Sequence, residues 1–112
     1  MSILLANTCG VKMIVTDDNF KNVIETHKLI MIDFWAEWCR PCKMFSPVIE
    51  EVSNETGIWL GKLNVDENQV KTSEYSVNTI PTTILFKDGI RVKTIIGAKP
   101  KHAIIEELKE WL

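Results

Sequence analysis

Two cysteines placed three residues apart are the part of the sequence best suited to chemistry. They are Cys39 and Cys42, within the segment Trp38-Cys39-Arg40-Pro41-Cys42. On a helix this spacing puts both sulfur atoms on one face, one turn apart and close enough to form a small disulfide ring. Such a pair can exchange its disulfide with that of another molecule, so the spacing predicts thiol–disulfide exchange.

The two thiols are not expected to be equivalent. Cys39 falls where an apolar strand gives way to a helix, and the free N–H groups and dipole of the helix N-terminus favour a thiolate there. Cys42 continues the apolar stripe of the helix, so we expect it to be less exposed and less acidic. Cys39 would then attack a substrate disulfide, and Cys42 would attack Cys39 and release the reduced substrate. Pro41 fits the first helical turn and stiffens the loop.

One carboxylate interrupts the most apolar segment of the chain, residues 29–36. An ionised acid is costly to bury, so we expect Asp33 to have a raised pKa or a charged partner. From six residues before Cys39 it can reach the thiol pair and take the proton of Cys42 when that thiol attacks. Lys62, on a neighbouring predicted strand, could tune Asp33 by its charge. A solvated Asp33 and a surface Lys62 are the alternatives.

Other uses of the cysteine pair find less support in the chain. A structural zinc site needs four ligands, and the remaining cysteine and the two histidines, Cys9, His27 and His102, are scattered singly. Two inert packed thiols would leave the helix terminus unused. We therefore expect no metal. For Cys9 we expect a free thiol without a role, with glutathionylation or a disulfide-linked dimer as alternatives.

Composition excludes several classes of protein. The chain has 112 residues, 46% of them hydrophobic and 25% charged, which fits one globular domain with its own core. A net charge of −2 leaves no basic surplus for a nucleic acid partner. No apolar run approaches the roughly 20 residues of a membrane span, and the start of the chain has no export signal. We expect a cytoplasmic monomer without membrane contact.

The elements that must position the cysteines alternate along the chain. We expect an N-terminal extension over residues 1–12 and one domain over residues 13–112. Within it, the patterns predict strands at 13–15, 29–36, 58–65, 82–87 and 90–96, and helices at 17–27, 39–56, weakly within 66–75, and from Pro100. Thr16 is the expected cap of the first helix, with Asp17 and Asp18 in its first turn.

The order of these elements, β-α-β-α-β-α-β-β-α, predicts an α/β fold. Alternating strands and helices favour a parallel sheet with helices on both faces. Asp88-Gly89 is a typical hairpin turn and adds an antiparallel pair at one end. Pro47 lies inside the second helix and is expected to bend it, and Gly57 to end it.

Several separated motifs resemble the thioredoxin family. The strongest is Phe-Trp-Ala-Glu-Trp-Cys-Arg-Pro-Cys-Lys at 34–43, because a C-x-x-C pair beside a βαβ pattern is a known mark of thioredoxin-like proteins. Four more segments follow in the family's order: Asn64-Val65-Asp66, Ile80-Pro81-Thr82, Phe86-Lys87-Asp88-Gly89 and Gly97-Ala98. The resemblance covers about residues 13–112.

This resemblance implies a thioredoxin fold, with a central mixed sheet flanked by helices on both faces. It implies reduction of disulfides in protein substrates, with no bound cofactor and with electrons supplied indirectly from NADPH by a thioredoxin reductase. By position, Cys39 matches the nucleophile, Cys42 the resolving thiol, Asp33 the buried acid, Lys62 its neighbouring lysine and Pro81 a cis-proline beside the disulfide. The apolar rim that docks substrates is matched by Trp38, Ile80, Gly97 and Ala98, and a substrate segment could pair with the backbone near Ile80.

One position of the motif departs from the family. The usual glycine after the first cysteine is replaced by Arg40. A cation there favours the Cys39 thiolate and should make the protein a slightly stronger oxidant. Selection of acidic partners or of a particular reductase, or no role at all, are the alternatives. A non-catalytic binding subunit of a larger assembly is the alternative function, although such a subunit would not need Cys39, Cys42, Asp33 and Pro81 together.

Overall fold

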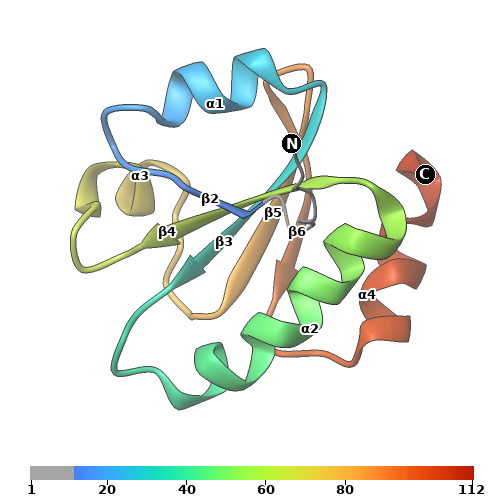
Figure 1. The fold of residues 1–112 in the computed structure, drawn as a ribbon. Helices are drawn as coiled ribbons and strands as arrows, with labels where there is room; N and C mark the ends of the chain where they lie inside the picture. Colours follow the sequence, from blue (N-terminus) through green and yellow to red (C-terminus); the bar gives the residue numbers. More distant parts are fainter. Residues whose placement is uncertain (1–11) are drawn as a thin grey trace, which may run out of the picture.

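The computed structural model describes residues 12–112, which form a mixed sheet between two layers of helices (Figure 1). The strand order across the sheet is β2-β4-β3-β5-β6. The strands are β2 (Lys12–Ile14), β3 (Leu29–Trp35), β4 (Trp59–Asn64), β5 (Thr82–Lys87) and β6 (Ile90–Ile96). The helices are α1 (Phe20–Thr26), α2 (Arg40–Thr56), α3 (Gln69–Glu74) and α4 (Lys101–Leu108), followed by the 3₁₀ turn η1 (Lys109–Trp111). The order predicted from the sequence is confirmed.

The central strand β3 is buried on both faces, which explains its apolar sequence. Alternate residues of a strand point to opposite faces. Ile30, Ile32 and Phe34 pack in a core with α1, whereas Met31 packs in a second core with α2 and α4. Asp33 follows the period of Met31, so its carboxylate lies on the α2 side of the sheet. The periodicity of one strand therefore places the buried acid under the helix that begins at the cysteines.

The sheet is less parallel than the alternating pattern predicted. β4 runs parallel to both β2 and β3, but β5 is antiparallel to β3 as well as to β6. The expected Asp88-Gly89 hairpin is present between β5 and β6, with both residues at positive φ. The additional antiparallel pair arises because the connection through α3 returns the chain in the opposite direction. The result is the mixed sheet that the family resemblance implied.

Helix α2 begins and ends close to the predicted residues. Cys39 is its N-cap, Pro41 lies in its first turn, and the helix continues through Pro47. Gly57 ends it in the left-handed conformation, with φ of 78°, and its N–H donates to the Ser53 carbonyl at 2.9 Å. The helix therefore presents its N-terminus, with the two cysteines, at the end of β3.

The first helix starts later than predicted. Its N-cap is Asn19, and Thr16 instead exchanges two hydrogen bonds with Asn19 in the preceding turn. The Asp17 carboxylate does not serve α1; it accepts the backbone N–H groups of Val70 and Lys71 at 3.3 and 2.8 Å. Asp17 thus caps α3, because the free N–H groups of that short helix lie beside the turn. Pro100, expected as the first residue of the last helix, is its N-cap.

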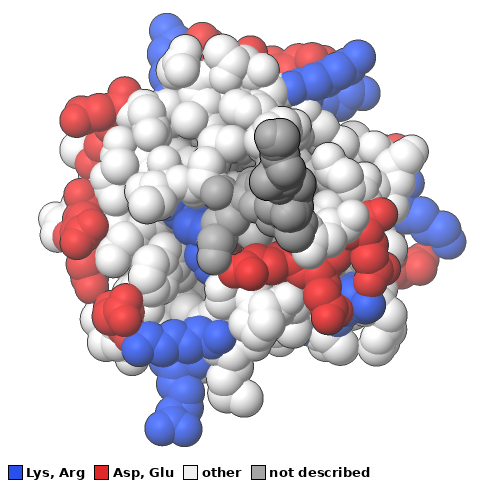
Figure 2. All heavy atoms as spheres, in the orientation of Figure 1, with Lys and Arg blue, Asp and Glu red and all other residues white. Residues whose placement is uncertain are grey.

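Two of the expectations concern residues outside the described part of the chain. Cys9 and residues 1–11 of the expected extension lie there, while Lys12 already belongs to β2. No helix within residues 12–112 is long and apolar enough to cross a membrane. On the face shown in Figure 2, acidic and basic side chains are interspersed, as a net charge of −2 suggests.

Candidate active site

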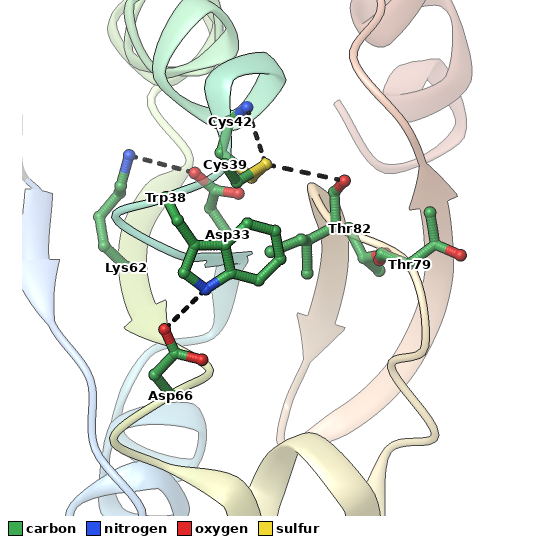
Figure 3. Close-up of a disulfide and its surroundings, with 9 residues drawn as sticks. Asp33, Trp38, Cys39, Cys42, Lys62, Asp66, Thr79 and Thr82 are labelled. Atoms are coloured by element: carbon green, nitrogen blue, oxygen red, sulfur yellow. Dashed lines mark hydrogen bonds and ion pairs between the residues drawn. A yellow bond between two sulfur atoms is a disulfide. The ribbon is translucent and has the colours of Figure 1, made fainter.

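Cys39 and Cys42 form a disulfide at the N-terminus of α2 (Figure 3). Their Cα atoms are 5.3 Å apart, inside the usual range for a disulfide, so the helical turn brings the two residues together without displacement of the backbone. Ala36 is buried with the cysteines, and Trp35, Val65 and Ile80 pack against them. The pair predicted from the spacing is therefore assembled as one redox-active unit.

The two sulfur atoms differ in their hydrogen bonds rather than in their exposure. Cys39 is 4% exposed and Cys42 2%, so the expected contrast in exposure is absent from this disulfide form, because the surrounding apolar residues cover both. However, Cys39 Sγ accepts the backbone N–H of Cys42 at 3.2 Å. A donor from the first turn of a helix stabilises negative charge on the sulfur it faces. The first turn of α2 therefore directs a backbone donor at Cys39 Sγ.

A cis-proline segment lies beside the disulfide. The peptide bond between Ile80 and Pro81 is cis, and the Ile80 carbonyl oxygen lies 3.9 Å from Cys39 Sγ. The Pro81 carbonyl accepts the N–H of Gly97 at 2.8 Å, which ties this segment to the end of β6. The structure therefore brings Ile80, Pro81 and Gly97, which are far from the cysteines in sequence, to the disulfide.

Asp33 and Lys62 form an ion pair beneath the start of α2. They are register partners on β3 and β4, and Lys62 Nζ lies 3.1 Å from Asp33 Oδ2. Asp33 is fully buried, and its carboxylate points toward the disulfide in Figure 3. Burial raises the pKa of Asp33 above its usual value, and the nearby Lys62 charge offsets only part of that effect. A carboxylate with a raised pKa is a better proton acceptor than a free one.

Two hydroxyl groups near this ion pair were not recognised in the sequence. Ser46 on α2 accepts a hydrogen bond from Lys62 Nζ at 2.7 Å. Thr83 on β5 is the register partner of Asp33 and is 1% exposed. The i, i+4 spacing of Cys42 and Ser46 placed the serine on the cysteine face of α2, and this is the one signal that could have identified it.

The residues expected to dock substrates differ in their exposure. Trp38 is 70% exposed, and its indole N–H donates to Asp66 Oδ2 at 2.8 Å (Figure 3). Ile80 and Gly97 are half-buried, and Ala98 is exposed. Asp66 was noted in the sequence only as part of a motif. Its contact with Trp38 places it at the edge of the site.

Arg40 and Pro41 lie on the exposed side of the redox pair. With Met44 and Ala98, they line a shallow surface hollow between the start of α2 and the segment after β6. Within residues 12–112, no group of three or more histidine, cysteine or acidic side chains could hold a metal ion. His27 lies elsewhere, with its ring against that of Trp59 at 4.8 Å.

Comparison with known proteins agrees with this geometry. The family model described as Thioredoxin matches residues 11–110. A thioredoxin from Mycobacterium bovis is 48% identical over 99 residues, covering 86% of this chain and 85% of that protein. The chain belongs to the thioredoxin family. The solved structure of a thioredoxin variant from Halobacterium salinarum superposes with a TM-score of 0.85 at 30% identity, and the match covers 96% of each chain.

A second kind of relative joins two activities in one chain. A bifunctional thioredoxin reductase/thioredoxin from Mycobacterium leprae is 44% identical over 108 residues, which is 94% of this chain and 24% of that protein. This thioredoxin-family chain thus matches one part of a larger protein as well as complete thioredoxins.

Family membership and the assembled cysteine pair establish the class of activity. The protein is a thiol–disulfide oxidoreductase with a redox-active disulfide, as the sequence predicted, and the non-catalytic binding subunit is not favoured. Thioredoxins need no prosthetic cofactor, because the cysteine pair is itself the redox group. The family implies two kinds of partner, a reductase and proteins that contain disulfides.

Proposed function

We propose that this protein reduces substrate disulfides in two steps, with a separate role for each cysteine. In the reduced protein the Cys39 thiolate attacks one sulfur of a substrate disulfide. A mixed disulfide forms, and the first substrate thiolate leaves. The hydrogen bond from the Cys42 N–H to Cys39 Sγ is the observation that carries this assignment, because it favours the anion on Cys39 alone.

The second step uses the buried acid. The Cys42 thiol transfers its proton to the Asp33 carboxylate, and the resulting thiolate attacks Cys39 Sγ. The second substrate thiolate leaves, and the Cys39–Cys42 disulfide seen in this structure is the product. Burial suits Asp33 to this role, because it raises the pKa of the carboxyl and makes the carboxylate more basic. Lys62 limits the rise through its positive charge.

Substrate docking is assigned to the rim and to the cis-proline segment. Trp38, Ile80, Gly97 and Ala98 offer partly exposed apolar surface around the disulfide. An extended substrate segment could add backbone hydrogen bonds near Ile80, since Pro81 holds that backbone beside Cys39. Arg40 and Pro41 would tune the redox pair from its exposed side.

The electrons are proposed to come from NADPH through a thioredoxin reductase. The fused reductase and thioredoxin of Mycobacterium leprae supports such a partnership, because one chain there bears both names. We further propose that the protein acts as a cytoplasmic monomer. One catalytic pair per chain, built from residues of that chain alone, is sufficient for the two steps.

Reduction of insulin disulfides by dithiothreitol with catalytic amounts of protein tests the proposal. The wild type should accelerate the reaction, and Cys39→Ser should remove the acceleration. Asp33→Asn should slow turnover at neutral pH and weaken its dependence on pH, because the proton acceptor is lost. Undiminished turnover in Cys39→Ser would refute the nucleophile assignment, and an unchanged pH profile in Asp33→Asn would refute the role of the acid.

A further inference from the structure

A row of polar side chains leads from the buried acid to the outer side of α2. Lys62 Nζ lies 3.1 Å from Asp33 Oδ2 and 2.7 Å from Ser46 Oγ. The Ser46 hydroxyl in turn lies 3.2 Å from Glu50 Oε2, one helical turn further along α2. Ser46 therefore connects the lysine of the site to a carboxylate outside it.

The direction of each hydrogen bond in this row is fixed by chemistry. An ammonium group only donates, and a hydroxyl has one proton to give. Ser46 must accept from Lys62, and its own proton goes to Glu50. Glu50 thereby orients the serine lone pairs toward Lys62, which makes Ser46 a fixed acceptor for the ammonium group.

The Lys62 ammonium is better aligned for a hydrogen bond with Ser46 than with Asp33. Among residues 12–112, neither oxygen of Asp33 has an aligned hydrogen-bond partner, although the Lys62 charge is close. The well-aligned bond of the ammonium goes to Ser46 instead. The lysine is also held from a second side, since its Nζ lies 5.5 Å from the centre of the Trp35 ring.

We propose that Ser46 is a positioning residue that holds the Lys62 ammonium beside the Asp33 carboxylate but out of hydrogen-bond alignment with it. The inference rests on the proposed role of Asp33 as proton acceptor. The lysine gives Asp33 its charge at 3.1 Å, while Ser46 takes the better-aligned hydrogen bond of the ammonium.

The charged groups around Asp33 come from two elements. Burial is the largest influence on the pKa of Asp33 and raises it, Lys62 on β4 lowers it by its charge and by its contact with the carboxylate, and Glu50 on α2 raises it. Thr83 on β5 is uncharged, and Cys42 on α2 titrates only in the reduced protein. A better-aligned hydrogen bond to the charged form of a carboxyl lowers its pKa further. The position of the Lys62 ammonium therefore decides how basic Asp33 is.

Ser46 and Lys62 both lie at a surface hollow next to the redox pair. Cys42, Ser46 and Lys62 line the same surface hollow, which has a volume of about 570 Å³. The lysine side chain is 12% exposed and forms part of the wall of this hollow. Loss of the serine acceptor would leave the Asp33 carboxylate, 3.1 Å away, as an acceptor for the ammonium.

The test is a carboxyl ¹³C NMR titration of Asp33 in the oxidised protein, in which neither active-site cysteine titrates. In Ser46→Ala the Asp33 midpoint should fall by about one pH unit, because the ammonium turns to the carboxylate. Ser46→Thr keeps the hydroxyl and should restore the wild-type midpoint. Ser73→Ala, an exposed serine on α3, is the matched control and should leave the midpoint unchanged. An unchanged or higher midpoint in Ser46→Ala overturns the inference.

A double-mutant cycle tests whether Ser46 changes the Asp33 midpoint through Lys62. In Lys62→Met the Asp33 midpoint should rise, and adding Ser46→Ala should then change it no further. Equal shifts from Ser46→Ala with and without Lys62 would show that the serine acts on Asp33 by another route, against the inference. Failure of the underlying function is distinguishable, because it appears as an unchanged pH profile of disulfide reduction in Asp33→Asn, whatever the titrations show.

Discussion

Asp33 and Thr83 face each other across β3 and β5, and neither side chain has an aligned hydrogen bond to another residue of 12–112. Both are almost completely buried, so the molecule keeps a carboxylate and a hydroxyl in its interior with one nearby ammonium as compensation. An unsatisfied buried polar group costs stability. We infer that the fold tolerates this cost because the same burial makes Asp33 a proton acceptor.

The first prediction concerns stability and its pH dependence in Asp33→Asn. Because burial raises the pKa of Asp33, the folded wild type holds the proton more tightly than the unfolded chain. Its contribution is therefore most favourable below the ordinary carboxyl pKa of 3.8 and is lost as pH rises through the folded-state pKa. Asn carries no charge at neutral pH and removes this loss, so the variant should be more stable than the wild type at pH 7.

Urea unfolding at acidic and neutral pH checks this prediction. The advantage of Asp33→Asn should shrink as the pH falls toward the value of an unfolded carboxyl group. Asp88→Asn, in the exposed hairpin turn, is the matched control, and its effect should stay within about 0.5 kcal/mol. A neutral-pH destabilisation in Asp33→Asn would show that the Lys62 ion pair outweighs the cost of burying the charge.

The sequence predicts what local patterns determine. Pro41 in the first turn of α2 and Gly57 at its end are residue types that prefer those positions, so the predicted bounds of α2 were nearly correct. The buried acid was also predictable, because apolar residues surround Asp33 on its own strand. The antiparallel pairing of β5 with β3 was not, because a connection of that length leaves the direction of the next strand open.

Other contacts were not predicted because they join residues that are far apart in the sequence. Ser46 and Lys62 are 16 residues apart, and their contact depends on how α2 lies across β4. The i, i+4 spacing from Cys42 places this serine on the cysteine face of α2, but it does not indicate which strand residue the serine meets. Asp17 and Lys71 are 54 residues apart, so a carboxylate expected to favour α1 by its dipole caps α3 instead. Contacts of this kind become visible only when the tertiary packing is known.

The second prediction tests the cap that Asp17 supplies. Asp17→Ala removes the acceptor of the Val70 and Lys71 N–H groups, which should destabilise the protein by about 1 kcal/mol. Amide hydrogen exchange should increase first in α3 rather than in α1. Asp18→Ala, the adjacent acid, is the control and should cost less. Faster exchange confined to α1 would support the role that the sequence first suggested for Asp17.

The third prediction separates the two cysteines. In a Cys9→Ser background, Cys42→Ser should accumulate a mixed disulfide with a substrate, because the resolving thiol is missing. Cys39→Ser in the same background should accumulate none, since the hydrogen-bonded thiolate is missing. Intact-mass spectrometry after acid quenching measures both products. Equal trapping by the two variants would contradict the assignment of Cys39 as the nucleophile.

The fourth prediction concerns the close approach of β2 and β3 to Gly61 on β4. A Cβ atom at this position would lie 2.6 Å from Val15 Cγ2 and 2.9 Å from Ile32 Cδ1. Gly61→Ala should therefore destabilise the protein by about 1–3 kcal/mol, as overpacking does. Adding Val15→Ala should cost less than the sum of the single changes, because it removes one of the clashes. Strict additivity in urea unfolding would show that the clash is relieved elsewhere.

The last prediction concerns the arginine between the cysteines. A cation at an exposed position beside Cys39 stabilises the thiolate by about 0.5 kcal/mol, which is typical of surface charge pairs. Through the two-electron relation this is roughly 10 mV, so Arg40→Gly should lower the redox potential by about that amount. Arg40→Gln should give the same result without the added backbone freedom of glycine. Equilibration with glutathione measures the potential, and the difference should shrink at high salt because exposed charges are screened. An equal or higher potential in both variants would mean that Arg40 does not act on Cys39 by its charge.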